Sequence, residues 1–136
     1  MPKRQRRSDC PIHFAMETFG DRWTLLILRD LLLKSRSTYS EFLNADERIA
    51  TNILADRLQR LQSDGLVVRS KDGRYRPTTK ALDLLPTLVE MILWSASYDQ
   101  ATGTPPEFIE RAHLDREGLL AELRSACSVA TEQADQ

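Results

Sequence analysis

Apolar residues recur with the period of an α-helix along most of the chain, which predicts a mainly helical fold. Pro11 suits the first turn of a helix because its missing N–H would have no partner there, and Gly20 suits the position after the last turn. We therefore expect a helix at residues 11–19 with Cys10 as its N-cap. A second helix follows Asp21, whose carboxylate can cap it, and ends at the break formed by residues 35–37.

Two further helices separated by a polar turn come next, at residues 39–44 and 49–63, in the order of a helix-turn-helix. A rotation of 100° per residue sorts the longer helix into two faces. The apolar face holds Ile53, Leu54, Leu58 and Leu61. The opposite face holds Asn52, Ala55, Asp56 and Gln59, with Thr51 and Arg60 on its flanks. The second helix of such a pair is the one that enters the major groove of DNA.

A short basic hairpin follows this helix directly. Gly65 ends the helix, Val67 and Val68 begin a strand, and the pair Asp72-Gly73 predicts a hairpin with a two-residue turn. The return strand ends near Pro77, which cannot donate to the ladder. A helix that feeds into a basic hairpin is typical of a winged helix-turn-helix, so the fold class is mainly α with a small β-hairpin wing.

The C-terminal half predicts more helices. One begins near Thr79, and Pro86 should kink or split it. Residues 102–106 break the pattern, and shorter helical segments follow, one of them with Asp115 at a capping position. We expect a basic, mobile tail at 1–9, a winged helix-turn-helix domain at 10–100 and an acidic helical extension at 101–136.

Charge is distributed unevenly along the chain. The 136 residues carry a net charge of −1. Residues 1–98 hold 16 basic and 12 acidic side chains, whereas residues 99–136 hold 3 basic and 8 acidic ones. Residues 57–80, which include the hairpin, hold 7 basic and 2 acidic side chains. Local basicity of this kind favours a polyanionic partner, and double-stranded DNA is the partner that fits a helix-turn-helix.

The residue types on the exposed face fit base recognition. Asn52 and Gln59 can each pair with adenine, and Thr51 can contact a base or a phosphate. Asp56 can accept from cytosine or hold a neighbouring arginine in place. We predict base reading by these four residues. Contacts to the DNA backbone are predicted for the start of the supporting helix, the reading helix and the wing: Arg36, Thr38, Tyr39, Ser40, Arg60, Lys71, Arg74 and Arg76.

Other function classes have little support. The sequence has no apolar run of about 20 residues and no signal peptide, so we expect a cytoplasmic protein that does not enter a membrane. It has no phosphate-binding loop or metalloprotease motif, and Cys10, His13, His113 and Cys127 do not have zinc spacing. We expect no enzyme activity, no metal and no cofactor. Two alternatives remain: a winged helix used for protein interaction, with charges that are only solvated, and a thiol redox enzyme using Cys10.

Motifs spread over residues 10–98 resemble the HxlR-type family of bacterial winged helix-turn-helix regulators, which are related to the MarR type. They are Cys10-Pro11, Gly20-Asp-Arg-Trp23, Ile27-Leu28, Tyr39-Ser-Glu-Phe42, Ile49-Ala50, Leu54, Leu58-Gln-Arg-Leu61, Asp64-Gly-Leu66, Tyr75-Arg-Pro-Thr78 and Leu85-Pro86. The resemblance implies a homodimeric transcriptional regulator, which we expect to be a repressor, with terminal helices that form the dimer. Arg22, Ala50 and Ala81 depart from the Lys, Ser and Gly common in the family, and the hairpin is shorter than usual.

The resemblance adds a dimer surface and an effector to the expected features. We place the dimer contacts at Ile12 and Met16 and at the apolar stripe formed by Leu119, Leu120 and Leu123. That stripe can instead pack within its own chain. Some members of the family sense oxidants or electrophiles through a cysteine that matches Cys10; the alternative is an unreactive capping residue. A small-molecule pocket lined by Phe14, Met16, Trp23, Met91 and Trp94 is conceivable, although such residues more often belong to a core.

Overall fold

The computed structural model describes the backbone of residues 7–134 and the side chains of residues 7–127. The first six residues of the predicted basic tail lie outside this range. The described chain forms helices α1 to α8 and one hairpin: α1 Pro11–Phe19, α2 Arg22–Leu33, α3 Tyr39–Leu43, α4 Thr51–Ser63, β1 Val67–Arg69, β2 Tyr75–Pro77, α5 Thr79–Leu82, α6 Leu85–Tyr98, α7 Pro106–Leu114 and α8 Arg116–Ala134. This is the mainly helical winged helix-turn-helix that the sequence predicts.

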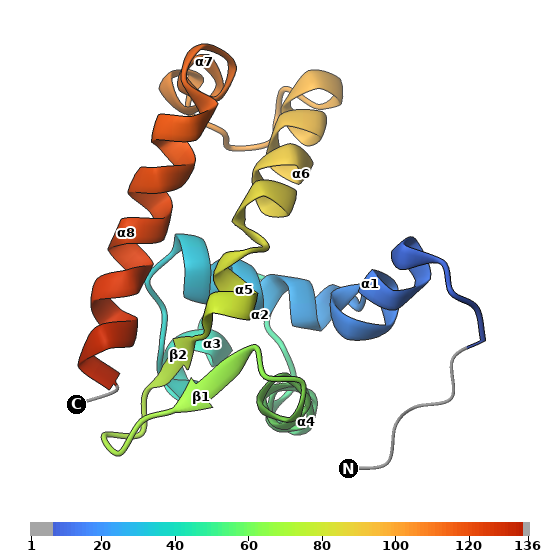
Figure 1. Ribbon diagram of the computed structural model, residues 1–136, viewed down its shortest axis with the longest axis vertical. Coiled ribbons are helices and arrows are strands. Elements are labelled where there is room, and N and C mark those ends of the chain that lie inside the picture. Colours follow the sequence, from blue (N-terminus) through green and yellow to red (C-terminus); the bar gives the residue numbers. More distant parts are fainter. Residues whose placement is uncertain (1–6, 135–136) are drawn as a thin grey trace.

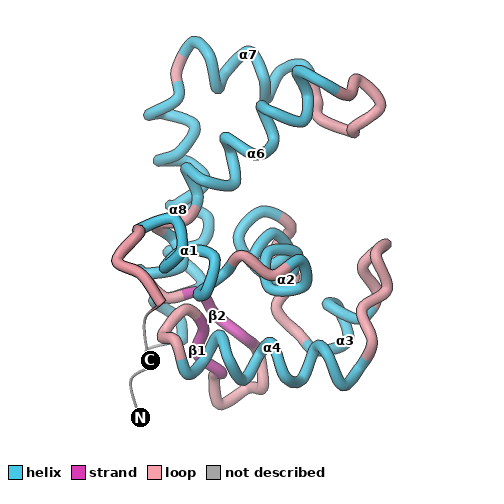
Figure 2. The backbone as a smooth tube through the Cα atoms, turned by 90° about the vertical axis from the view of Figure 1, so that its right-hand side faces the viewer, coloured by secondary structure: helices cyan, strands magenta, loops and turns pink. Residues whose placement is uncertain are grey.

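The core lies where α2, α4 and the hairpin meet. Its largest fully buried side chains include Leu28 of α2, Phe42 of α3 and Leu54 of α4. The hairpin and α4 lie at the end of the long axis opposite α7, and α6 and α8 connect the two ends (Figure 1). In the view at right angles, α4 still lies along that end (Figure 2). The packing therefore fixes α4 at one extremity of the molecule.

Local capping explains where the helix-turn-helix elements begin. The Asp21 carboxylate accepts a hydrogen bond from the Thr24 N–H at 3.0 Å, as the sequence predicts for an N-cap. Thr38 and Glu41 form a reciprocal capping box at the start of α3. Gly65 has φ of 76°, a left-handed conformation that costs glycine little, and it ends α4. Short-range signals thus encode where α2 and α3 begin and where α4 ends.

The hairpin has the predicted strands but a different turn. Val68 pairs with Arg76, and Arg69 pairs with Tyr75, in an antiparallel register. The Ser70 N–H donates to the Arg74 carbonyl oxygen at 2.7 Å, which leaves three residues in the loop. The predicted two-residue Asp72-Gly73 turn is therefore wrong. Gly73, with φ of 86°, takes the left-handed position that a three-residue hairpin loop requires.

Pro86 splits the predicted long helix, as expected. The chain forms α5 up to Leu82, and α6 starts at Leu85 with Pro86 in its first turn. Thr78, rather than Thr79, is the N-cap residue of α5. The split changes the chain direction and directs α6 away from the hairpin (Figure 1).

Helix α8 folds back along the domain and buries its own apolar stripe. Leu119 and Cys127 are buried, and Leu120 and Leu123 pack against both core clusters. Asp115 caps α8 by accepting from the Gly118 N–H at 3.1 Å. The stripe predicted for a dimer surface thus packs within the chain, the alternative that the sequence left open. It extends the core from the hairpin to α7.

Candidate nucleic-acid interface

Helix α4 presents a polar face to the surface. Leu54, Leu58 and Leu61 are buried, as the helical projection predicts. The four predicted base-reading residues and Arg60 are all exposed: Thr51, Asn52, Asp56, Gln59 and Arg60. They come from a helix at the extremity of the molecule (Figure 2). These side chains are therefore accessible to a partner that approaches this end of the molecule.

The N-terminus of α4 is held by α3 and leaves its own first turn uncapped. The Tyr39 hydroxyl donates to the Thr51 carbonyl oxygen at 2.8 Å, which ties the two helices of the motif. Ala50 is the N-cap residue and makes no side-chain cap hydrogen bond. The N–H groups of a first turn suit anionic oxygens, including those of phosphate. A serine at position 50 could cap these N–H groups with its hydroxyl. Ala50 has no hydroxyl, so the N–H groups remain available to an anion.

Asp56 belongs to a chain of ion pairs that orients Arg57. Nη1 of Arg57 donates to the Asp56 carboxylate at 2.6 Å, and its Nε donates to the Asp21 carboxylate at 2.8 Å. The hydrogen bond from Arg57 lowers the pKa of Asp21 to about 2. Asp56 therefore holds a neighbouring arginine, one of the two roles considered for it, while its exposed carboxylate still lies on the polar face of α4.

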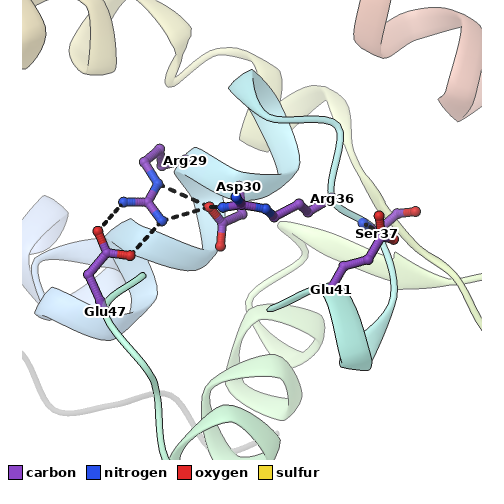
Figure 3. A network of polar contacts seen from close by, with 6 residues as sticks. All are labelled: Arg29, Asp30, Arg36, Ser37, Glu41 and Glu47. Carbon is purple, nitrogen blue, oxygen red and sulfur yellow. Dashed lines mark hydrogen bonds and ion pairs between the residues drawn. The ribbon is translucent and has the colours of Figure 1, made fainter. Parts of the chain in front are cut away.

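A cluster of charged side chains around Asp30 anchors both turns of the motif (Figure 3). Asp30 is only 2% exposed and accepts from Arg29 and from Arg36, each at 2.7 Å. Arg29 also forms a two-bonded pair with Glu47, at 2.7 and 2.9 Å. This pair lowers the pKa of Glu47 to about 2. Arg36 lies in the turn before α3, and Glu47 lies in the turn before α4. The buried Asp30 carboxylate therefore connects the two turns, directly through Arg36 and indirectly through Arg29 and Glu47.

Sequence reasoning missed this cluster. It assigned Arg36 to phosphate, whereas the structure turns its guanidinium toward Asp30. A signal was present, because Asp30 falls among the apolar positions of α2 and a buried carboxylate needs cationic partners. The other residues predicted at the start of α3 differ in exposure: Thr38 and Tyr39 are half-buried and used in internal hydrogen bonds, and Ser40 is exposed.

The wing arginines have unequal access to a ligand. Lys71 is exposed at the tip of the hairpin. Arg74 is half exposed, donates to the Ser37 Oγ at 2.8 Å and lies 3.8 Å from Glu41, so it joins the wing to α3. Arg76 is only 14% exposed and lies 3.5 Å from Asp72. Lys71 and Arg74 are thus the predicted wing residues best placed for phosphate.

The two cysteines have opposite surroundings. Cys10 is exposed at the N-cap of α1. Cys127 is buried in α8, where its thiol donates to the Leu32 carbonyl oxygen at 3.3 Å and burial raises its pKa. Within the described residues, no three His, Cys, Asp or Glu side chains come together as a possible metal site. No helix in the same range is long and apolar enough to cross a membrane.

The aromatic and methionine residues considered for a pocket are dispersed. Four of them are exposed: Phe14, Met16, Met91 and Trp94. The sequence favours a place in the core for these residues, and that prediction is wrong. Trp23 lines only a very small pocket, beside Ile27 and Phe42. Met91 alone among the five lines a larger cavity, which lies between α2, α6, α7 and α8.

Comparisons with known proteins agree with this geometry. A model described as HxlR-like helix-turn-helix matches residues 18–102. The HTH-type transcriptional regulator YdzF of Bacillus subtilis is 27% identical over 95 residues, which are 65% of this chain and 87% of YdzF. The HTH-type regulator sll1512 of Synechocystis is 27% identical over 88 residues, covering 60% of this chain and 64% of that protein.

Two solved structures share the arrangement. PA1607, a candidate transcription factor, superposes with a TM-score of 0.62 at 32% identity and covers 73% of this chain and 72% of its own. Quinone-bound YodB from B. subtilis superposes with a TM-score of 0.57 at 27% identity and covers 65% of this chain and 99% of its own.

Proposed function

The chain belongs to the HxlR-like helix-turn-helix family and is a DNA-binding transcriptional regulator, and we propose that it acts as a dimeric repressor of a pseudo-palindromic operator. The observation that carries the proposal is the exposed polar face of α4, presented at one end of the molecule. Thr51, Asn52, Asp56 and Gln59 read base edges in the major groove. Arg60, Lys71 and Arg74 hold phosphates on either side.

The dimer is supported by the exposure of α1. This helix has no buried residue of its own, although its composition is strongly apolar. Ile12 is 70% exposed and Met16 is 62% exposed. Trp94 and Tyr98 of α6 are also exposed, and their rings are in tilted contact with centroids 5.3 Å apart. A helix that leaves most of its apolar side chains exposed in the monomer gains stability when a second copy covers them.

A two-fold dimer determines the form of the operator. Two α4 helices related by the dimer axis enter successive major grooves, so the half-sites lie about 10 bp apart or a multiple of that spacing. Repression follows from occupancy, because a dimer bound across a promoter covers DNA that RNA polymerase needs.

A salt titration of DNA binding tests the DNA-reading role. Fluorescently labelled duplex DNA is titrated with the protein between 50 and 200 mM salt, and about 6–10 phosphate contacts would lower the affinity by roughly 10³–10⁵ across that range. An affinity that stays flat with salt supports the rival role of a protein-interaction module. Transcription from a promoter that carries the operator should fall when the protein is added, and a rise would identify an activator.

A second candidate function is thiol sensing through Cys10. Its thiol is exposed at the N-cap of α1, where a dissolved electrophile can reach it, and one solved relative is described as quinone-bound. In this role the Cys10 sulfur adds to a ring carbon of a quinone. A C–S bond forms, the ring takes up the thiol proton and becomes a hydroquinone, and the altered α1 changes the dimer.

Benzoquinone treatment of the wild type and of Cys10→Ser tests the sensing role. The wild type should gain the mass of one quinone per chain and lose DNA affinity, whereas Cys10→Ser should do neither. The buried Cys127, present in both proteins, is the internal control. Equal modification of the two proteins, or modification without a change in affinity, would leave Cys10 as a capping residue.

A further inference from the structure

A cavity of about 740 Å³ lies between α2, α6, α7 and α8. This volume is within the range of small-molecule sites, roughly 300–1,000 Å³. Part of its wall comes from residues 18–102, which match the family model, and part from the segment beyond them, including Thr104, Phe108 and Leu123. The C-terminal extension of this chain therefore helps to enclose the cavity.

The residues that line the cavity are mostly apolar, and three of them are charged. Leu25, Leu33, Leu88, Ile92 and Phe108 are among its apolar residues. Its charged residues are Arg29, Lys34 and Glu47, which leave one net positive charge. Arg29 already makes four hydrogen bonds, to Asp30 and Glu47. For Lys34, which is exposed, no side-chain partner is recorded among the described residues, so its ammonium is the cation available to a ligand.

We propose that this cavity binds a small apolar monocarboxylic acid. The apolar body of the acid packs between α2, α6 and α7, and its carboxylate pairs with the Lys34 ammonium. One negative charge matches the excess positive charge of the wall, and a charged partner adds a charge-assisted hydrogen bond to the apolar burial.

Ligand binding here is coupled to the reading helix through Arg29 and Glu47. Both residues line the cavity, and their two-bonded pair fixes the turn before α4. A carboxylate that reaches Arg29 from the cavity competes with Glu47 for its guanidinium and loosens that turn, so the acid weakens DNA binding. This coupling rests on the proposed DNA-reading function, whereas binding of the acid does not.

Calorimetry on the full-length protein tests the site without DNA. The probes are 2-naphthoate and decanoate, each compared with its neutral amide at pH 7, where the acids are ionised. At least one acid should bind about tenfold more tightly than its amide, and Lys34→Met should lose about that factor, the effect expected of one charge-assisted hydrogen bond. Lys80→Met, which removes an equal charge outside the cavity, should bind the acid as the wild type does.

Three results of this calorimetry would contradict the proposed acid-binding site. In the first, neither acid binds, for example because a second copy of the chain fills the cavity. In the second, the amides bind as tightly as the acids. In the third, Lys34→Met binds the acid as well as Lys80→Met does.

The coupling is tested by titrating duplex DNA with and without a saturating amount of the acid. The affinity of the wild type for DNA should fall roughly 5-fold or more, the lower end of typical allosteric couplings. Glu47→Gln should still bind the acid, at least as tightly, and its DNA affinity should no longer respond. An unchanged wild-type affinity would contradict the coupling. Failure to bind DNA without any acid would count against the proposed function alone, because the heat of acid binding is measured separately.

Discussion

Asn52 and Gln59 carry the side chains best suited to the proposed base recognition. Both amides are exposed on α4, and no hydrogen bond is recorded for either within the described chain. An amide in this state is free to make a bidentate pair with adenine. Asp56 differs, because its carboxylate already accepts a hydrogen bond from Arg57, and only its remaining acceptor capacity is available to a base.

Asn52→Ala should remove one base contact and leave the fold intact. We expect a loss of about 1–3 kcal/mol of binding free energy per half-site and relaxed specificity at one position in each half-site. Binding to operators that vary at each position measures both effects. Gln62→Ala, an exposed change near the end of the same helix, is the matched control and should bind with wild-type specificity. Equal losses in the two variants would exclude Asn52 from base reading.

Arg74→Ala should act on affinity rather than on specificity. In the proposed complex its guanidinium contacts phosphate once per protomer, so all duplexes should bind more weakly to the same extent, and the slope of log affinity against log salt should fall by about 2 for the dimer. Arg111→Ala, which removes an equal charge that pairs with Glu122 far from the wing, should leave the slope unchanged. A loss confined to one sequence would assign Arg74 to base reading.

At the scale of elements, ion pairs position α3 and α4. Buried Asp30 holds Arg29 and Arg36, and through Arg29 it reaches Glu47. Asp21 separately links the start of α2 to Arg57 in α4. The elements that face DNA are thus attached to α2 by charged side chains in addition to the apolar core.

Asp30→Ala should be strongly destabilising. Two arginines would lose their buried partner, and breaking such a pair typically costs about 3–5 kcal/mol of unfolding free energy. Urea denaturation measures the change. Asp83→Ala breaks the exposed pair with Arg124 at 2.9 Å and should cost no more than about 1 kcal/mol. Similar costs for the two variants would show that the cluster around Asp30 is not a buried anchor.

Acid should weaken the fold in a defined pH window. The folded pKa values of Asp21 and Glu47 are about 2, below their usual values of 3.8 and 4.5. A lowered carboxyl pKa contributes stability that is present above the usual pKa and is lost as pH falls toward 2. The unfolding free energy should therefore decline between about pH 5 and pH 2.

Glu47→Gln provides the control for this pH dependence, since its amide does not titrate. Its unfolding free energy should be lower than that of the wild type at pH 7 and should decline less steeply in the same window. A wild-type curve that is flat from pH 5 to pH 2 would contradict the lowered pKa values.

Local signals in the sequence predicted the elements but not their tertiary partners. Pro11, Asp21, Gly65 and Pro86 act within one turn of themselves, so helix ends were predictable. Contacts between distant segments were not. The pairing of Arg36 with Asp30 depends on how the turn before α3 folds back, and no spacing rule encodes it.

In the whole molecule, the tertiary partners of α8 and α1 were likewise not predictable from the sequence. Both carry apolar stripes, and the sequence could not tell which one packs within the chain. The structure buries Leu119 in its own core and leaves Ile12 exposed. The difference arises because the loop at 99–105 reverses the chain and brings α8 back onto α2 and β2, whereas α1 packs no residue fully against the body (Figure 1).

Met16→Glu should prevent dimer formation. A charged side chain in an apolar interface is costly to bury, so sedimentation should show a monomer, and affinity for a two-half-site duplex should fall to that of a single half-site. Leu114→Glu places the same charge on another exposed apolar residue, at the end of α7, and should remain a dimer. A dimeric Met16→Glu protein would move the interface away from α1.

Selection of bound sequences from random duplex DNA tests whether a dimer reads DNA with α4. At low salt, the selection should enrich a two-fold related sequence with half-sites about 10 bp apart or a multiple of that spacing. Asn52→Ala should enrich the same half-sites with one position in each relaxed. Enrichment of no sequence, or of a site without two-fold symmetry, would contradict a dimer that reads DNA with α4.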